Sequence, residues 1–265
     1  MTTEAQVLGP VRPMPAARAA SLPVQFWILF RMQLARVRLA WRPYIMVSTV
    51  MPVGIVVLVW LINRHATDVS AVGRQVVEGS VVLSLTISSE SMLAQRVAFM
   101  RLTRAFDYYA AMPVSLGLLV AAVAGAFLLF ALPGMLAVQI LGSLMFGISR
   151  VPNLEVLLFI PPTAFALAGI GGWLGLAARD DQLAAVFGNL VMMLVLFMGS
   201  IPPENMPWAL QAARWVLPST YLVEALKGSL RGPLSMPHLF GYLAIVSGQA
   251  LLLLWLVGKR IEWRR

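Results

Sequence analysis

The longest apolar stretch of the chain is Ser115–Phe146, SLGLLVAAVAGAFLLFALPGMLAVQILGSLMF, which carries no charged side chain. A helix needs about 20 apolar residues to cross a bilayer, so this stretch is longer than one crossing requires. Pro133 and Gly134 lie near its middle, and a proline commonly bends a helix. We therefore expect one long transmembrane helix that is tilted or kinked.

The composition of the whole chain agrees with a membrane protein. Of the 265 residues, 60% are hydrophobic and 12% are charged; the charged share of a soluble domain is roughly twice as large, about 25%. A soluble globule cannot hide this much apolar surface, and a disordered chain does not contain it. The net charge is +9, from 20 basic and 11 acidic residues. Basic loops on the cytoplasmic side explain that excess better than a nucleic-acid partner does.

Five further segments are apolar and long enough to cross the membrane. They are residues 43–62, 76–97, 154–176, 183–200 and 238–257. With 115–146 they predict an all-α membrane protein of six transmembrane helices, a single domain over residues 24–265 after a disordered cytoplasmic tail at 1–23. With both termini inside, the inner segments hold 14 Lys and Arg residues and the outer segments hold 6. This bias predicts that both termini are cytoplasmic.

Val24–Arg42, before the first span, has the pattern of a helix lying on the membrane surface. At 100° per residue one apolar stripe contains Phe26, Phe30, Leu34, Val37 and Trp41. Arg31 and Arg38 border that stripe, and arginines beside an apolar face suit the lipid headgroup layer. A helix packed on protein is the alternative. The residues we assign to this interfacial helix are Phe30, Arg31, Arg38 and Trp41.

Two segments are neither spans nor simple loops. Residues 98–114 are polar, basic and aromatic, which predicts a cytoplasmic loop with one short helix. Residues 201–237 carry several prolines between amphipathic pieces. We expect a re-entrant hairpin there, with short helices at Trp208–Leu217 and Tyr221–Leu230 dipping into the outer leaflet. Non-helical backbone at that depth must be buried in protein or line a wet cavity.

The motifs of common enzyme classes are missing. The sequence has no Gly-x-x-x-x-Gly-Lys-Ser/Thr phosphate loop, no Gly-x-Ser-x-Gly, no His-Glu-x-x-His and no cysteine. His65 and His238 fall in predicted outer loops and Asp180-Asp181 in a polar turn, where such side chains are ordinarily solvated. We predict no catalytic, cofactor-binding or metal-binding residue, and an intramembrane enzyme is poorly supported.

Three local sequences carry a resemblance to a known family. They are Tyr108–Ser115 (YYAAMPVS), the series Met206–Trp208 (MPW), Leu217–Tyr221 (LPSTY) and Glu224–Gly228 (EALKG), and the arginine-rich helix before the first span. In this order they resemble the type 2 ABC transporter permease family over about residues 24–260. The first is similar to the end of the family's cytoplasmic coupling helix, and the second to its outer re-entrant signature. The chain departs from the family at Gln95-Arg96 and Arg101–Arg104, where Glu and Gly-Thr are frequent, and at Lys227, where Arg is common.

The resemblance implies a mechanism of transport. Two permease copies, as a homodimer or a heterodimer, would form a pathway through the lipid of a prokaryotic cytoplasmic (inner) membrane. Two separate ABC ATPase subunits, which bind ATP and Mg, would push on the coupling helix. The residues expected to couple are the aromatic anchors Phe106, Tyr108 and Tyr109 and the register-setting charges Arg101, Arg104 and Asp107. The alternative is that these aromatics only lie in the headgroup layer. In the hairpin, the signature residues are Pro207, Trp208, Pro218, Tyr221 and Glu224.

The segment 76–97 is unusually polar for a membrane helix. Its serine stripe, Ser80, Ser84, Ser88 and Ser91, should face other helices or water, and it either lines a cavity or lets helices approach closely. Glu90 is a functional candidate, unless it lies near the inner boundary and pairs with Arg96 or Arg101. The candidate pathway residues are Ser84, Ser88, Glu90 and Asn189. Gly171 and Gly175 have a spacing that favours helix packing.

The leading hypothesis is thus the membrane subunit of an ABC exporter of the drug-export branch. Its cargo would be an amphipathic drug, lipid or antibiotic-like molecule. Short outer loops leave no receptor domain, which favours export over import. The alternatives are a lipid-linked glycan exporter and, from a different class, a passive channel or membrane scaffold.

Overall fold

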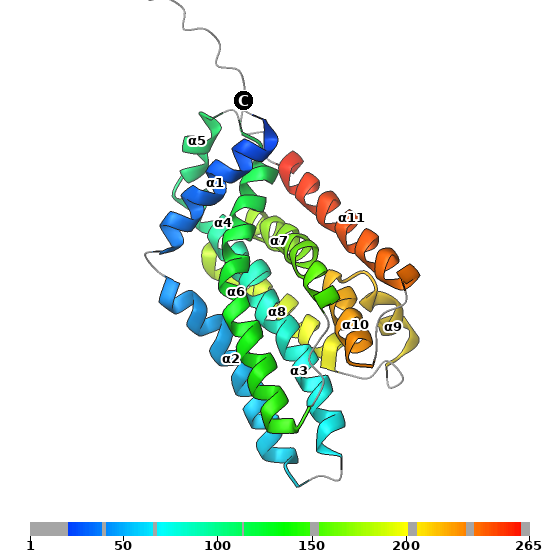
Figure 1. Cartoon of the computed structure of the whole chain (residues 1–265). Helices are drawn as coiled ribbons and strands as arrows, with labels where there is room; N and C mark the ends of the chain where they lie inside the picture. Colours follow the sequence, from blue (N-terminus) through cyan, green and yellow to red (C-terminus); the bar gives the residue numbers. More distant parts are fainter. Residues whose placement is uncertain are drawn as a thin grey trace, which may run out of the picture.

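Helices make up all the regular structure of the residues described by the computed structural model, which are 21–38, 41–65, 68–112, 114–148, 154–200, 206–231 and 236–260. The predicted all-α class is confirmed for these ranges. In chain order the elements are α1 (Leu22–Val37), α2 (Trp41–Asn63), α3 (Val69–Thr86), the π turn η2 (Ile87–Ser91), α4 (Met92–Leu102), α5 (Ala105–Ala110), α6 (Leu116–Phe146), the 3₁₀ turn η3 (Leu154–Leu158), α7 (Ile160–Ala177), α8 (Asp181–Ser200), α9 (Trp208–Arg214), α10 (Pro218–Arg231) and α11 (Met236–Arg260) (Figure 1).

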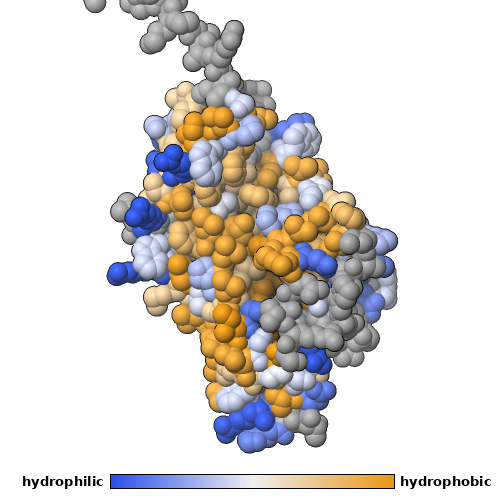
Figure 2. Space-filling view, in the orientation of Figure 1, coloured by the Kyte–Doolittle hydropathy of each residue, from blue (hydrophilic) through white to orange (hydrophobic). Residues whose placement is uncertain are grey.

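Five helical segments are long and apolar enough to cross a membrane. They are Trp41–Asn63, Val69–Leu102, Leu116–Phe146, Leu154–Ala177 and Pro237–Lys259. The chain is therefore a multi-pass membrane protein. Figure 2 shows hydrophobic side chains over much of the visible face, with hydrophilic ones at its lower tip and along its upper left edge. α8, where a further span is predicted, has a shorter apolar stretch over Gln182–Val195. The count of six spans stays a prediction.

The most polar of these segments occupies the centre of the bundle. α3, η2 and α4 form one helical rod, and α2, α6, α7 and α8 pack around it. The most apolar window of this rod is 89% buried, against 17% in α2 and in α11. Placing the polar helix inside shields its hydroxyl and carboxyl groups from lipid, where they would be costly.

The central rod is longer than the predicted span 76–97 at both ends. α3 begins seven residues earlier, at Val69, because the Asp68 side chain accepts a hydrogen bond from the Ala71 backbone N–H at 3.0 Å and caps the helix. Polar Arg74 and Gln75 made this turn look like a loop. At the other end, α4 continues to Leu102, into the predicted cytoplasmic loop.

Backbone contacts through glycines hold α7 against the rod. A Cβ atom at Gly171 would collide with the backbone of Glu90, and one at Gly175 would collide with the Ala94 carbonyl oxygen. The predicted packing role of this pair is confirmed. Small residues at such seams let helices approach closely and are common in membrane bundles.

α1 packs along α6 at the end of the bundle that carries α5 (Figure 1). Leu29 is buried, while Phe26 and Phe30 lie beside Gly125 of α6. Trp27 and Ile28 stay exposed on the opposite side. The predicted apolar stripe is thus partly covered by protein, and an interfacial position of α1 stays a prediction.

The predicted bounds of that first helix need correction. α1 runs over Leu22–Val37, and Trp41 belongs instead to α2, which begins there. Of the other assigned interfacial residues, Arg31 and Arg38 are exposed and Phe30 is half-buried. The predicted tail at 1–23 lies outside the described residues up to 20, and residues 22 and 23 belong to α1.

Candidate functional site

The site begins at the sharp turn between α4 and α5. α4 ends at Leu102, and Thr103 Oγ1 donates to the Phe99 carbonyl oxygen at 2.8 Å. Arg104 then has φ +52°, the left-handed region, and is the only described residue other than glycine with a positive φ. Such a conformation is uncommon for a side chain of this size. It turns the chain abruptly, so that α5 forms a separate short helix beyond the rod.

α5 divides the predicted coupling residues between its two faces. Phe106 and Tyr109 point into the protein, and Tyr109 is completely enclosed. Asp107 and Tyr108 are exposed, Tyr108 with 58% of its surface accessible. The rings of Tyr108 and Tyr109 meet edge to face at 5.4 Å. In this arrangement Phe106 and Tyr109 anchor α5 to its own chain, and the exposed pair is left to meet a partner.

The Tyr109 hydroxyl joins α5 to α1. It accepts hydrogen bonds from Gln33 Nε2 at 2.8 Å and from an Arg36 guanidinium nitrogen at 3.1 Å. The Arg36 guanidinium carbon also lies 6.0 Å from the centre of the Tyr109 ring. Gln33 is buried, so this contact lies inside the protein. The sequence signal for it was a polar Gln33 within the apolar stripe of α1.

Arg101 is directed away from α5 and toward α7. One guanidinium nitrogen donates to the Leu176 carbonyl at 2.7 Å and to the Ala178 carbonyl at 3.0 Å. These carbonyls belong to the carboxyl end of α7, where the last backbone acceptors of a helix lack helical partners. Arg101 therefore fastens the end of the rod to the end of α7. Of the predicted charges, Arg104 and Asp107 are the exposed ones on the α5 side.

The candidate pathway residues do not form one site. Ser84 Oγ donates to the Ser48 carbonyl at 2.8 Å, and Ser48 Oγ donates to the Phe130 carbonyl at 3.0 Å, which links α3, α2 and α6. Ser88 and Glu90 are fully enclosed, whereas Asn189 is exposed on α8. For Ser84 the structure favours close helix approach over cavity lining.

The α9–α10 hairpin is held by an ion pair that sequence reasoning missed. Arg214 of α9 is buried and pairs with Glu224 of α10, and Lys227 Nζ lies 3.6 Å from the same carboxylate. Thr220 Oγ1 donates to the Arg214 carbonyl, and the Tyr221 hydroxyl donates to the Trp215 carbonyl at 2.7 Å. Arg214 had no visible partner in the sequence, because ten residues and a turn separate it from Glu224.

Two prolines of the predicted hairpin lie at the starts of its helices. Pro207 directly precedes α9, and Pro218 begins α10. Trp208 is 82% exposed, so it packs little against the described protein. The observed helices are shorter in α9 and longer in α10 than predicted, and residues 201–205 and 232–235 lie outside the described ranges.

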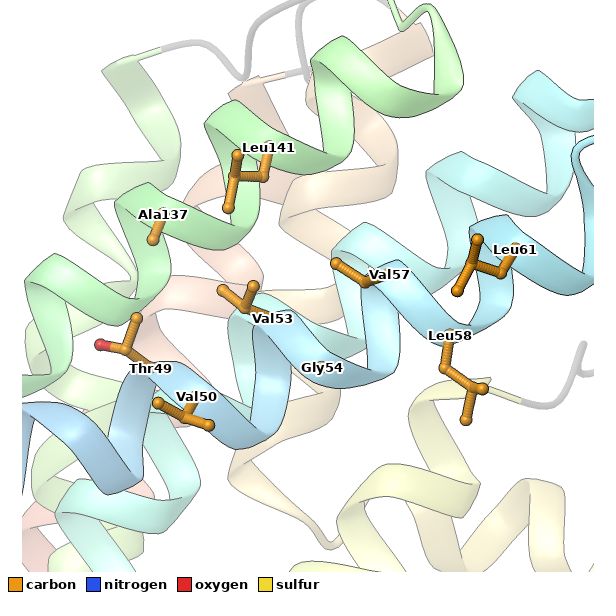
Figure 3. Close-up of a pocket in the computed structure, with 9 residues that line it drawn as sticks. All are labelled: Thr49, Val50, Val53, Gly54, Val57, Leu58, Leu61, Ala137 and Leu141. Carbon is orange, nitrogen blue, oxygen red and sulfur yellow. The ribbon is translucent and has the colours of Figure 1, made fainter.

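An apolar groove of about 550 Å³ runs between α2 and α6 (Figure 3). It is lined by Thr49, Val50, Val53, Gly54, Val57, Leu58, Leu61, Ala137 and Leu141. Its wide opening and nearly uniform apolar lining suit a hydrocarbon chain and offer little to a polar ligand.

Comparison with known families decides the class. A family described as ABC-2 type transporter matches residues 24–230, from α1 to the end of α10. The chain belongs to the ABC-2 type transporter family. No curated protein matches it. An ABC-2 permease is a membrane component of a transporter without an ATPase domain of its own, and members of the family generally work with ABC ATPase partners.

In this ABC-2 permease the sequence predicted a short helix within the loop 98–114 but not the contacts inside that segment. The predicted loop 98–114 contains the turn and the short helix α5, although Pro113 lies outside the described residues. Tyr108, Arg104 and Asp107 remain exposed, as contact with another subunit requires. The partners of Tyr109 and Arg101 within the chain were not predicted.

Proposed function

We propose that this ABC-2 permease is the membrane subunit of an ATP-driven exporter, in which two copies form the pathway and two separate ATPase subunits drive it. The observation that carries the proposal is the form of α5. It is a short helix at one end of the bundle, anchored inward by Phe106 and Tyr109 and presenting Tyr108 and Asp107 outward. A helix held in this way can receive a push without sliding over its own protein.

The exposed face of α5 has the chemistry of a protein-binding surface. Tyr108 offers a large rigid aromatic surface, and such side chains are frequent binding hot spots. Arg104 and Asp107, which carry opposite charges, both precede Tyr108 in the sequence. Charges around an aromatic anchor set the register and suppress wrong partners. ATP and Mg would be bound by the ATPase and not by this chain.

Two contacts can carry a displacement of α5 into the bundle. Tyr109 links α5 to α1 through Gln33 and Arg36. Arg101, three residues before Arg104, links the same end of the rod to α7. A push on α5 would thus reach α1 and α6 on one side and α7 on the other, because each contact joins separate elements.

The cargo is proposed to be amphipathic: a drug, a lipid or an antibiotic-like molecule. The apolar groove between α2 and α6 supports a membrane-embedded rather than a water-borne cargo. Both termini and α5 would face the cytoplasm of a prokaryotic cell, α8 would serve as a sixth span, and the α9–α10 hairpin would lie in the outer leaflet. Export is proposed over import because the short predicted outer loops leave no receptor domain.

The test is reconstitution of the permease with its ATPase in lipid vesicles, comparing wild type with Tyr108→Ala. We expect at least tenfold weaker association with the ATPase and loss of most permease-dependent ATP hydrolysis, with folding preserved, because Tyr108 is exposed. Trp208→Ala is the matched control, since it removes an exposed aromatic on α9, which lies apart from α5 (Figure 1). Unchanged coupling in Tyr108→Ala would refute the assignment of α5.

The exporter and a passive channel or scaffold differ in whether an ATPase subunit copurifies with the permease. Mild extraction from native membranes should bring an ABC ATPase with the permease in equal amounts. A channel needs no such subunit, and uphill movement of cargo by the permease alone would overturn the proposed mechanism.

A further inference from the structure

The π turn η2 places a carboxyl group in the centre of the bundle. Glu90 has no accessible surface, and among the described residues neither of its carboxyl oxygens has a hydrogen-bond partner. The hydroxyls of Ser88 and Ser89 on the same turn are also enclosed and unpartnered. π turns are rare within helices and are frequent at functional sites.

No cation balances this carboxyl within the described ranges. η2 packs against α2, α3, α4, α6, α7 and α8. α6 and α7 contain no ionisable residue, and α8 contains only Asp181, its first. The ionisable residues of the remaining elements are Arg42 and Tyr44 in α2, Arg74 and Glu78 in α3, and Arg96 and Arg101 in α4.

Each of these groups is engaged elsewhere or distant along its helix. The Arg96 guanidinium lies 5.8 Å from the centre of the Phe99 ring, and Arg101 binds the end of α7. The predicted alternative, a pair between Glu90 and either arginine, is therefore wrong. Arg42 lies over Trp41, and Tyr44 packs on Phe127. Glu78 precedes Glu90 by twelve residues, about 18 Å along a helix.

An ionised carboxylate without a partner is the costly state in such a place. Its desolvation is far more unfavourable than that of a neutral acid, and buried groups of this kind neutralise instead. A small metal ion is a poor alternative ligand, because Ser88, Ser89 and Glu90 follow one another around a helix and point in different directions. A proton needs only the carboxyl itself.

The packing around η2 leaves water no direct access. Gly171 of α7 approaches the Glu90 backbone so closely that a Cβ atom would collide with it. On α8, a Cβ atom at Gly188 would lie 2.9 Å from Ser91 Oγ. Because α7 and α8 lie directly against η2, separating either helix from the rod would give water a path to the carboxyl.

We propose that Glu90 is a proton-binding site whose proton exchanges with water only when α7 or α8 moves away from η2. In the closed packing the group is a neutral acid. In an arrangement that opens this seam, hydration favours the carboxylate. Proton binding and the closed packing therefore stabilise each other, as two linked equilibria must.

Infrared spectroscopy of the purified chain in lipid vesicles tests the proposal without ATPase or cargo, so its outcome does not depend on the proposed function. At neutral pH we expect the difference spectrum, wild type minus Glu90→Gln, to contain the carbonyl band of one protonated carboxylic acid. Glu78→Gln, on the same rod, is the matched control. The spectrum of this variant should still contain the acid band that Glu90→Gln loses. A difference spectrum with carboxylate bands instead would overturn the proposal.

Two further measurements keep the test decisive. If Glu90→Gln does not fold, Glu90→Asp should keep an acid band at a shifted frequency, and its absence would contradict the proposal. In heavy water the wild-type band should shift slowly at rest, at least tenfold slower than the exchange of exposed carboxyl groups. A shift at the exposed rate would show that water reaches Glu90 without helix movement.

Discussion

At the scale of single residues, the Tyr109 hydroxyl makes the contact that joins α5 to α1. The hydroxyl oxygen accepts hydrogen bonds from two donors of α1, Gln33 Nε2 and an Arg36 guanidinium nitrogen. Gln33 already has an unpartnered Oε1 atom, so losing this contact would leave the whole buried amide unsatisfied. An unsatisfied buried polar group costs about 1–3 kcal/mol.

Tyr109→Phe should therefore loosen α5 while keeping the packed ring. We expect the free energy of unfolding to fall by about 1–3 kcal/mol and the backbone amides of α5 to exchange hydrogen faster, measured by mass spectrometry. Tyr108→Phe is the control, since its hydroxyl lies on an exposed residue. Equal exchange in the two variants would show that the hydroxyl does not hold α5.

The residue scale also shows where sequence reasoning stops. Phe106, Tyr108 and Tyr109 were predicted to anchor in the pocket of a partner, mainly from the family resemblance, and Phe106 and Tyr109 are instead buried in their own chain. Which ring faces inward could not be predicted, since α5 has only six residues and shows little more than one helical turn of pattern. The left-handed Arg104, which sets the direction of α5, has no signal in its own residue type.

At the scale of elements, helix ends were predictable where a local cap exists. α6 begins one residue after the predicted Ser115, whose side chain accepts from the Leu118 N–H at 3.3 Å, and ends as predicted at Phe146, before a left-handed Gly147. The π turn was not predictable, because the serines of η2 fit an α-helical stripe equally well. η2 packs against α7 and α8, and such contacts between distant segments have no local sequence pattern.

The α9–α10 hairpin gives a prediction at this scale. Arg214→Met would keep much of the buried volume but remove the partner of Glu224, leaving Lys227 as its nearest charge. Because Glu224 is partly exposed, we expect a loss below the 3–5 kcal/mol of a fully buried pair, about 1–3 kcal/mol. Faster hydrogen exchange over α9 and α10 would report it.

The matched control for the hairpin is Lys227→Met, which removes the more distant cation of the same carboxylate. It should change the exchange of α9 and α10 much less. If both variants behaved alike, the Arg214–Glu224 pair would hold the hairpin no better than an ordinary surface contact.

At the scale of the whole molecule, the arrangement follows from where polar groups can lie. The sequence indicated that the serine stripe must avoid lipid, and the structure meets this by surrounding α3, η2 and α4 with other helices. Sequence reasoning could not choose between a wet cavity and a closed seam, because small polar residues serve both. Glycines on α6, α7 and α8 decide for the seam, since each brings its helix close to the rod.

If close packing at that seam stabilises the fold, replacing a glycine of the seam by alanine should destabilise the protein more than the same change elsewhere. Gly171→Ala would drive a Cβ atom into the Glu90 backbone, whereas Gly241 of α11 has no heavy atom within 4 Å of the same position. Overpacking a closed contact costs about 1–3 kcal/mol, and alanine is otherwise the better helix former. Gly171→Ala should therefore lower the melting temperature in detergent, and Gly241→Ala should leave it unchanged or raise it. Equal melting temperatures would mean that α7 can shift away from the rod without cost, and that the bundle is not closed around Glu90.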